Sequence, residues 1–327
     1  MTREMLRKFK TTRQLVKKYN LDLTGLNVFT EAATGNYFFT AIAAALAGAK
    51  NVFAYNSEAI NIMAKFCGFF KMFQYDFPEL NSIEFVTDKN KIAEADIITN
   101  SGYVRPITSK DVDSMKKTAV IALMMQIDQV RNSDINLVEC FLNGIKCVPV
   151  DEYEIGIAHS MNFKLMKVLF VAGLSVWGDK YLFCGGGDLT YNVLDFFNKN
   201  GIHADKISSG SWLGDTNKLC YDAIVIHDYY TNTLWVGKEK DHPVISIERI
   251  LAQNPLLKII NISGNADIIS LVCADIDVFP LQEPIYGKTT ISGDYLSHKV
   301  TIELNVAALK AAEKESRRRL NNDGIAS

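Results

Sequence analysis

The chain has 327 residues, of which 48% are hydrophobic and 22% charged, so it is a folded globular protein long enough for two domains and not a disordered or fibrous chain. The formal net charge of −2 supplies no basic excess to attract nucleic acid or an anionic membrane, and we expect neither as a partner. No apolar run approaches the roughly 20 residues that a bilayer requires.

The first expected element is a helix in the basic segment MTREMLRKFKTTRQLVKKYN, whose apolar residues fall on one helical side. We favour a helix packed on the body of the protein or on a sister protomer, and a transit peptide is the alternative. The cysteines show no CxxC spacing and indicate buried, reduced thiols in a cytoplasmic protein.

Short β-rich runs then alternate with helical or polar segments, as parallel strands with crossover helices do. The expected strands are LNVFTEAA, NVFAYN, IEFVTD, ADIITN and AVIALM, and the expected first helix is GNYFFTAIAAALAGA. In the loop TEAATGNYFF, Gly35 and Asn36 are expected to begin that helix. Its N-terminus, with Thr34 and Asn36, would bind a substrate carboxylate or phosphate, while Glu31 disfavours an anion; plain helix capping is the alternative.

The segment NSGYVRPI follows a later strand and places Tyr103 and Arg105 at a strand end. The planar guanidinium of Arg105 would grip an anion, although an exposed arginine before Pro106 is an equal alternative. We therefore expect the first half to bind substrate through Glu31, Thr34, Asn36, Tyr103 and Arg105.

A helix within Ile155–Leu174 is expected to cross between the halves. The second half repeats the order of strands and helices found in the first. Its expected elements are KYLFCGGG, LTYNVLDFFNKNG, ADKISS, YDAIVIHD, KIINISG and DIDVF. Because ADIITNSGY corresponds to YDAIVIHDYY and KKTAVIALM corresponds to LLKIINISG, we infer an internal duplication. The predicted fold class is α/β, with two doubly wound parallel sheets.

The turn CGGGDLT places Gly185, Gly187 and Thr190 in a G-x-G-x-x-G series with threonine at the third position. The first glycine permits a tight strand-to-helix turn, and the second lets a pyrophosphate approach the helix N-terminus. We expect a dinucleotide site at Gly185, Gly186, Gly187, Asp188 and Leu189. A turn without ligand is the alternative, because the third glycine is missing and Asp188 adds negative charge.

The next strand ends in Ser208, where an acid would hold the adenosine ribose of NAD. Serine suits a 2′-phosphate better, so NADP is weakly preferred over NAD as the expected cofactor. The nicotinamide end is expected near Ser263, Gly264 and Asn265, at the carboxyl end of the strand KIINIS.

His227 and Asp228 end a central strand of the second half, where doubly wound sheets bind ligands. We expect His227 to serve as general acid or base, with its pKa raised by the Asp228 carboxylate, and both residues are assigned a catalytic role. A hydrogen-bonded structural histidine is the alternative.

Within residues 256–284, the sequence matches the pattern D-V-F-x-x-E-P through Asp277, Val278, Phe279, Glu283 and Pro284. It resembles the D-2-hydroxyacid dehydrogenases and, more loosely, S-adenosylhomocysteine hydrolase. The resemblance implies two Rossmann-like domains and an NAD(P) cofactor, and it covers the second half in sequence and the first half only in architecture.

That family uses an arginine, a histidine and a glutamate, and the resemblance carries over only the glutamate, as Glu283, the third expected catalytic residue. Gly264 and Asn265 stand in place of the arginine, and Glu303 or Asn305 in place of the histidine. A site without that cation cannot bind a 2-keto acid in the usual way, so the resemblance supports the fold and cofactor but not the family reaction.

We expect residues 1–152 to form the substrate-side domain, joined by the C-terminal helix 304–320, and residues 153–303 to form the dinucleotide-binding domain. The predicted function is an NAD(P)-dependent oxidoreductase acting on a small polar metabolite in a cleft between the domains. The alternative is a non-redox Rossmann-type biosynthetic enzyme or metabolite-binding protein. A methyltransferase is disfavoured, because Asn56 replaces the acid its site needs. A cytoplasmic homodimer without metal is expected.

Overall fold

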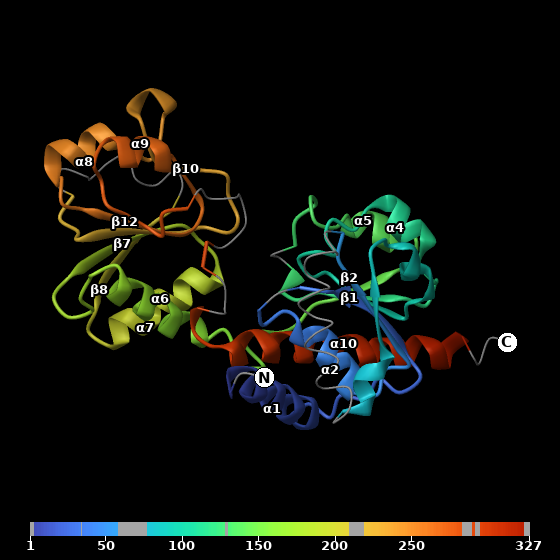
Figure 1. The fold of residues 1–327 in the computed structure, drawn as a ribbon. Helices are drawn as coiled ribbons and strands as arrows, with labels where there is room; N and C mark the ends of the chain where they lie inside the picture. Colours follow the sequence, from blue (N-terminus) through green and yellow to red (C-terminus); the bar gives the residue numbers. More distant parts are fainter. Residues whose placement is uncertain are drawn as a thin grey trace. The chain divides into compact units, whose positions relative to one another are not determined.

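The computed structural model describes residues 3–33, 35–57, 77–127, 130–208, 219–282, 290–291 and 295–323. The chain divides into two compact units, Met1–Ile155 with Ser297–Ser327, and Gly156–Leu296 (Figure 1). The sequence placed the domain boundaries after residues 152 and 303, whereas this division places them after Ile155 and Leu296. Both units are α/β folds built on parallel sheets.

The first unit contains a six-stranded sheet with the order β3-β2-β1-β4-β5-β6, and all its strand pairs are parallel. The chain builds the sheet outward from β1 in one direction and then returns to build outward from β4 in the other. The strand order therefore reverses between β1 and β4. The strands are β1 (Asn27–Glu31), β2 (Asn51–Tyr55), β3 (Ile83–Val86), β4 (Ile97–Thr99), β5 (Val120–Ala122) and β6 (Lys146–Val148).

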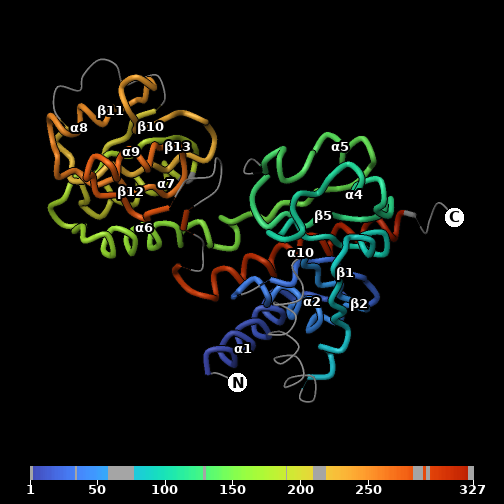
Figure 2. Tube along the Cα trace, turned by 45° about the horizontal axis from the view of Figure 1, so that its top comes forward, coloured from blue at the N-terminus to red at the C-terminus, as the bar shows by residue number. Residues whose placement is uncertain are grey.

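Helices cover both faces of this sheet, because alternate strand residues point to opposite sides and both sets are apolar. One face packs against α1 (Arg3–Lys18), α2 (Phe39–Leu46) and α10 (His298–Asp323), which lie together in both views of the fold (Figures 1 and 2). The other face packs against α4 (Ser109–Ser114) and α5 (Leu137–Leu142). Two 3-10 helices, η1 (Pro78–Ser82) and η2 (Asn90–Glu94), precede β3 and β4.

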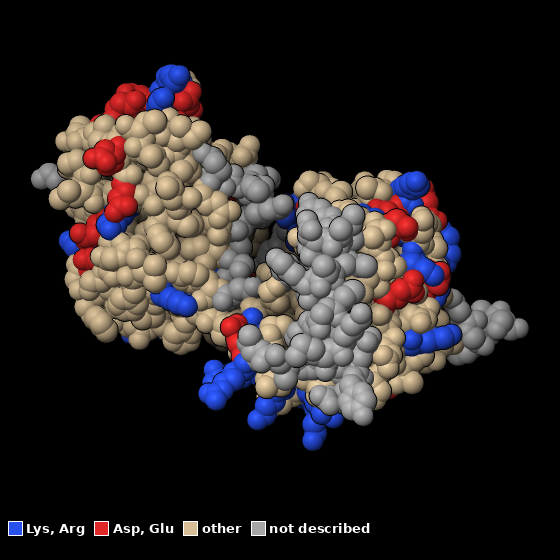
Figure 3. Space-filling view, viewed as in Figure 1, with Lys and Arg blue, Asp and Glu red and all other residues tan. Residues whose placement is uncertain are grey.

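The N-terminal helix α1 packs on the body of its own unit through Phe9, Thr12 and Leu15, which are buried. Its outward side exposes a series of cations, and Figure 3 shows the Lys and Arg side chains that gather over this helix. The apolar stripe predicted from the sequence is therefore the side that faces the core.

Two expectations about the first unit are wrong. Helix α2 begins at Phe39 and not at Gly35, because residues 35–38 form a turn in which the Asn36 carbonyl accepts a hydrogen bond from the Phe39 amide. Asn36 is thus not the helix cap. The C-terminal helix is longer than the expected 304–320, and its 26 residues begin at His298.

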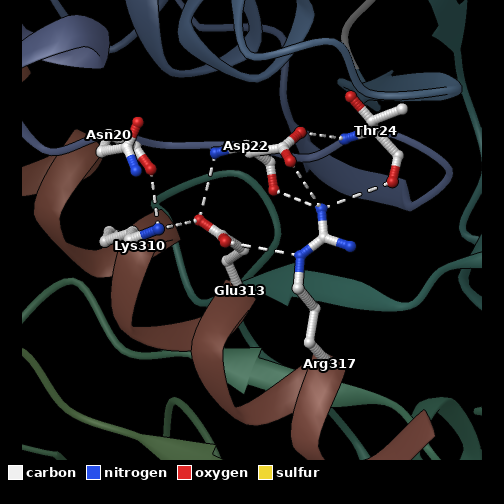
Figure 4. Close-up of polar contacts among 6 residues, drawn as sticks. All are labelled: Asn20, Asp22, Thr24, Lys310, Glu313 and Arg317. Carbon is white, nitrogen blue, oxygen red and sulfur yellow. Dashed lines mark hydrogen bonds and ion pairs between the residues drawn. The ribbon is translucent and has the colours of Figure 1, made fainter. Parts of the chain in front are cut away.

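Helix α10 is fixed to the segment between α1 and β1 by a buried glutamate (Figure 4). Glu313 is 5% exposed and accepts hydrogen bonds from the Asp22 amide at 3.1 Å and from Lys310 Nζ at 2.6 Å. Arg317 completes the cluster through the Glu313 carboxylate and the Asp22 carbonyl. A charged side chain is tolerated at this depth because both of its oxygens are paired.

The second unit has a five-stranded parallel sheet with the order β14-β12-β9-β7-β8 and a small parallel sheet with the order β11-β10-β13. The small sheet was not expected from the sequence. Its strands are β10 (Leu234–Gly237), β11 (Ile245–Ser246) and β13 (Asn265–Ala266). The main strands are β7 (Lys180–Cys184), β8 (His203–Ile207), β9 (Ala223–His227), β12 (Lys258–Ser263) and β14 (Val278–Phe279).

Helices α6 (Ser160–Val171) and α7 (Asp188–Lys199) pack on one face of the main sheet, and α8 (Ile247–Gln253) and α9 (Ile268–Cys273) pack on the other. A short 3-10 helix, η4 (Glu239–Asp241), follows β10. In this sheet the strand order reverses between β7 and β9. None of the helices in the described part of the chain has the length and apolar character that a bilayer crossing requires.

The cysteines are not uniformly buried, so that expectation is wrong in part. Cys140 and Cys184 are buried, whereas Cys220 and Cys273 are exposed. Cys67 lies outside the described residues.

We predict that Glu313→Ala lowers the free energy of unfolding of the first unit by about 3 kcal/mol, because it leaves Lys310 and Arg317 without their shared anion and the Asp22 amide without its acceptor. Lys314→Ala, an exposed change on the same helix, is the control and stays within about 0.5 kcal/mol. Urea unfolding with hydrogen exchange of peptides from α10 measures both, and equal stabilities would contradict the assigned role.

Candidate functional site

Each main sheet has one position where the strand order reverses, between β1 and β4 in the first unit and between β7 and β9 in the second. The loops that leave the carboxyl ends of two such strands diverge toward opposite faces of the sheet. In doubly wound folds this divergence forms the crevice in which ligands bind. Most of the candidate residues identified in the sequence follow the strands at these two positions.

In the second unit, the glycine turn connects β7 directly to α7. Gly185 has a φ of +142°, and a Cβ there would lie 2.2 Å from the backbone oxygen of His227. Gly187 has a φ of +84° and immediately precedes the first residue of α7, Asp188. These two positions therefore require glycine for backbone reasons alone, and the turn brings the amides at the start of a 12-residue helix to the crevice.

The two sides of this turn differ in their space for a ligand. A Cβ at Gly186 would meet no atom within 4 Å, so this residue borders open space. A Cβ at Gly187 would lie 2.1 Å from a ring carbon of Tyr230, so the tyrosine ring packs directly against this glycine. The turn is therefore open beside Gly186, whereas the space beside Gly187 is filled by a side chain that sequence reasoning did not identify.

His227 is the last residue of β9, at the strand-order reversal, and is fully buried. Its Nδ1 lies 2.8 Å from the hydroxyl oxygen of Thr190, and that hydroxyl also contacts the backbone oxygens of Gly186 and His227. Because those carbonyls take the hydroxyl proton, Nδ1 donates to Thr190 and Nε2 carries no proton. Nε2 itself makes no hydrogen bond to the described residues.

Asp228 raises the pKa of His227, as expected, but two larger effects reverse the net shift. Burial lowers the pKa of His227 to about 3, Lys164 lowers it further, and the opposing effect of Asp228 is smaller. The imidazole is therefore neutral near pH 7.

Asp228 is 1% exposed, and its carboxylate holds the loop that follows β9. It accepts hydrogen bonds from the amides of Tyr230 and Thr231, from the Thr231 hydroxyl, and from Trp235 Nε1 at 2.9 Å. Its backbone amide donates to the Ser263 carbonyl at 2.8 Å, which joins the ends of β9 and β12. Both carboxylate oxygens are thus engaged in positioning the loop that carries Tyr230.

The remaining candidates of the second unit have separate surroundings. Ser263 is fully buried and donates its hydroxyl to the Asp228 carbonyl, and Gly264 leaves no room for a Cβ because Ile226 would lie 2.6 Å away. Asn265 belongs to β13 in the small sheet. Ser208 follows β8, and the backbone of Leu189 lies in α7. Glu283 lies outside the described residues.

The first unit contains a pocket of about 440 Å³ at the carboxyl ends of β1 and β4. It is lined by Glu31, Ala33, Tyr37, Gly102, Tyr103 and Arg105. Three of these, Glu31, Tyr103 and Arg105, are among the five residues that the sequence assigned to substrate binding. Tyr37 was not singled out, although its neighbour Asn36 was.

Glu31 is the last residue of β1 and is 2% exposed. Its Oε2 accepts a hydrogen bond from the Tyr103 amide at 3.0 Å, and its Oε1 has no hydrogen-bond partner among the described residues. Burial raises the pKa of the Glu31 carboxyl to about 7, against smaller opposing effects of the Tyr103 amide, of Arg105 and of the Ser101 hydroxyl. Glu31 therefore exchanges a proton near neutral pH. In its protonated form it carries no negative charge that would repel an anion beside it.

Arg105 is held in place by an acid that the sequence analysis did not identify. Its Nη1 lies 3.0 Å from Asp134 Oδ2, and Arg131 contacts the same oxygen. Asn36 is 7% exposed, and its Oδ1 has no hydrogen-bond partner among the described residues. Thr34 lies outside the described residues.

Comparisons with protein-family models and with curated protein sequences returned no match. Solved structures match over most of both chains. A dipicolinate synthase chain from Bacillus halodurans has a TM-score of 0.53 at 10% identity, covering 91% of this chain and 99% of that one. A second dipicolinate synthase chain, from Bacillus subtilis, has a TM-score of 0.50 at 11% identity, covering 94% and 100%.

A putative D-3-phosphoglycerate dehydrogenase from Ralstonia solanacearum also matches, with a TM-score of 0.48 at 12% identity and coverage of 91% and 95%. At identities this low, likeness establishes fold alone. Together with the strand orders of the two sheets, the likeness to the dipicolinate synthase chains shows that this chain has the two-domain Rossmann-like α/β fold.

The raised pKa of Glu31 gives a pH-dependence for stability. Between its ordinary value of 4.5 and about 7, the folded protein keeps a proton that the unfolded chain loses, so the free energy of unfolding falls as pH rises through this window. Glu31→Gln should reduce the loss between about pH 5 and about pH 8 by on the order of 2 kcal/mol.

Urea unfolding at the two pH values measures this change. Glu84→Gln replaces an exposed acid on β3 of the same unit and serves as the control, for which the wild-type pH-dependence should persist. An unaltered pH-dependence in Glu31→Gln would show that the carboxyl does not retain its proton on folding.

Proposed function

We propose that the protein is an NAD(P)-dependent oxidoreductase that acts on a small polar metabolite. The cofactor binds to the glycine turn of the second unit, and the metabolite binds in the pocket of the first unit. The observation that carries the proposal is the turn between β7 and α7, which places glycines and a helix N-terminus at the strand-order reversal of its sheet.

The residues of the second unit fit the diphosphate of a dinucleotide on the open side of Gly186. The amides that begin α7 would donate to it, while the exposed carboxylate of Asp188 opposes it. A bound nicotinamide would supply the hydride that the reaction moves. Ser208, which directly follows β8, suits the 2′-phosphate of NADP. The Nζ of Lys206, two residues earlier, lies 3.5 Å from the centre of the Tyr191 ring.

The catalytic assignment of His227, Asp228 and Glu283 stays a prediction. The structure supports a positioning role for the first two, since His227 is buried with Thr190 and Asp228 organises the loop beside the glycine turn. In the first unit, Glu31 is a second candidate for proton exchange, because it lines a pocket and its carboxyl titrates near neutral pH. The expected homodimer also stays a prediction.

Titration of the protein with NADH and NADPH, followed by nicotinamide fluorescence, tests the proposal. We expect binding of at least one of them, and Gly186→Glu should weaken it at least about tenfold, because the new carboxylate faces the diphosphate. Asn198→Glu adds the same carboxylate at an exposed position near the other end of α7 and is the matched control, which should change the affinity by less than about threefold. No binding of either dinucleotide to the wild-type protein would refute the proposal.

A second candidate function is a non-redox biosynthetic or metabolite-binding protein with the same fold. One observation favours it: the Tyr230 ring fills the space beside Gly187 that a pyrophosphate uses in dinucleotide-binding turns. Under the first proposal, this ring must move when the cofactor binds, whereas under the second it remains in place.

Tyr230→Ala separates the two functions. If the ring moves to admit the cofactor, its removal should tighten NADH or NADPH binding about fivefold, because less of the binding energy is used to open the turn. Tyr230→Phe retains the ring and should bind like the wild type. Absence of dinucleotide binding in all three proteins, together with thermal stabilisation by another metabolite, would favour the non-redox function.

A further inference from the structure

We propose that the pocket of the first unit binds a sugar acid, that is, a ring that carries hydroxyl groups and one carboxylate. The pocket lies at the carboxyl ends of β1 and β4 and has a volume of about 440 Å³. The inference deepens the proposed function by naming the class of its metabolite, and it rests on that function only in treating the bound molecule as a substrate.

A hydroxyl group on the ligand would supply the hydrogen-bond partner that Glu31 lacks. Its Oε1 is buried and has no hydrogen-bond partner among the described residues, while Oε2 is occupied by the Tyr103 amide. A buried oxygen without a partner costs free energy, which a ligand group can recover. Because the carboxyl exchanges its proton near neutral pH, the partner must serve both states, and a hydroxyl both donates and accepts. An ammonium group would serve only the ionised state.

A second buried acceptor lies one residue from the pocket lining. The Oδ1 of Asn36 is buried without a hydrogen-bond partner among the described residues, and the neighbouring Tyr37 lines the pocket. Asn36 is not among the residues that line the pocket, so the need for a hydroxyl partner rests on Glu31.

A carboxylate on the ligand would bind to the guanidinium of Arg105. Its guanidinium is fixed at Nη1 by Asp134, and its side chain is 23% exposed and lines the pocket. That ion pair is its one hydrogen bond within the described part of the chain, so the remaining N–H groups are available to a ligand. A guanidinium held in this way matches the planar geometry of a carboxylate.

A ring in the ligand is favoured by the aromatic side chains of the pocket, Tyr37 and Tyr103, and by the pocket volume. The two tyrosines line the pocket, and Tyr37 is 36% exposed. Flat aromatic faces bury the C–H face of a ring with little loss of side-chain freedom. A volume of about 440 Å³ lies within the range of sites for ring-sized ligands and exceeds what a short-chain acid would fill.

The test compares three probes on the full-length protein by isothermal titration: glucuronate, glucose, which lacks the carboxylate, and cyclohexanecarboxylate, which lacks the hydroxyl groups. We expect glucuronate to bind at least about tenfold more tightly than either of the others. Equal binding of glucuronate and glucose, or no glucuronate binding at about 10 mM, would overturn the proposal.

Two variants assign the binding to this pocket. Arg105→Gln should remove the preference for glucuronate over glucose, and Tyr37→Ala, a change at a partly exposed side chain, should weaken glucuronate and glucose together by at least about threefold. Arg7→Gln, which replaces an exposed arginine on α1, is the control and should leave all three affinities unchanged. Wild-type binding in both pocket variants would place the ligand elsewhere and overturn the proposal.

The dinucleotide titration on the same samples separates this inference from the proposed function. Glucuronate binding without dinucleotide binding would support the pocket assignment and refute the oxidoreductase. Dinucleotide binding without glucuronate binding would refute the sugar acid and leave the oxidoreductase standing.

Discussion

The second unit depends on the close contact between Gly185 and the backbone oxygen of His227. A side chain at Gly185 would occupy the position of that oxygen, so β7 and β9 approach each other at their carboxyl ends only because residue 185 is glycine. Thr190 strengthens the same junction, because its hydroxyl reaches His227 from the first turn of α7. The glycine turn, α7 and the loop after β9 are thereby held around one crevice, and any ligand of this unit must fit the space that they leave.

The strand-order reversal is lined by different chemical groups in the two units. In the second unit, the reversal is lined by backbone amides, glycines and a buried neutral histidine, a surrounding that suits the diphosphate of a cofactor. In the first unit, it is lined by a buried carboxyl, a fixed guanidinium and two tyrosines, a surrounding that suits a polar metabolite. This division of chemistry follows from the side chains at the strand ends, since the sheets themselves are alike.

Sequence patterns predicted the strands of both sheets well, because long apolar runs such as AIVIH in β9 and KIINIS in β12 are buried on both faces. They also identified residues at both strand-order reversals, since Glu31 is the last residue of β1 and Gly185 directly follows β7. They did not predict the small sheet, whose two-residue strands β11 and β13 carry no periodic signal. The start of α2 was also misplaced, because a turn with glycine and asparagine resembles a helix cap.

Contacts between distant side chains were beyond sequence reasoning. Asp134, which fixes Arg105, comes from a separate loop, and Tyr230, which fills the space beside Gly187, follows a different strand. The pKa of His227 was predicted in the wrong direction, because the neighbouring acid is visible in the sequence and complete burial is not. The raised pKa of Glu31 has the same cause and was likewise not predicted.

The most direct test of the account is a crystal structure of the protein with NADPH. The account predicts a diphosphate within hydrogen-bonding distance of the amides at Gly186 and Gly187, with the Tyr230 ring displaced from its contact with Gly187. A dinucleotide bound away from this turn, or an undisturbed Tyr230 with no dinucleotide at saturating concentration, would contradict it.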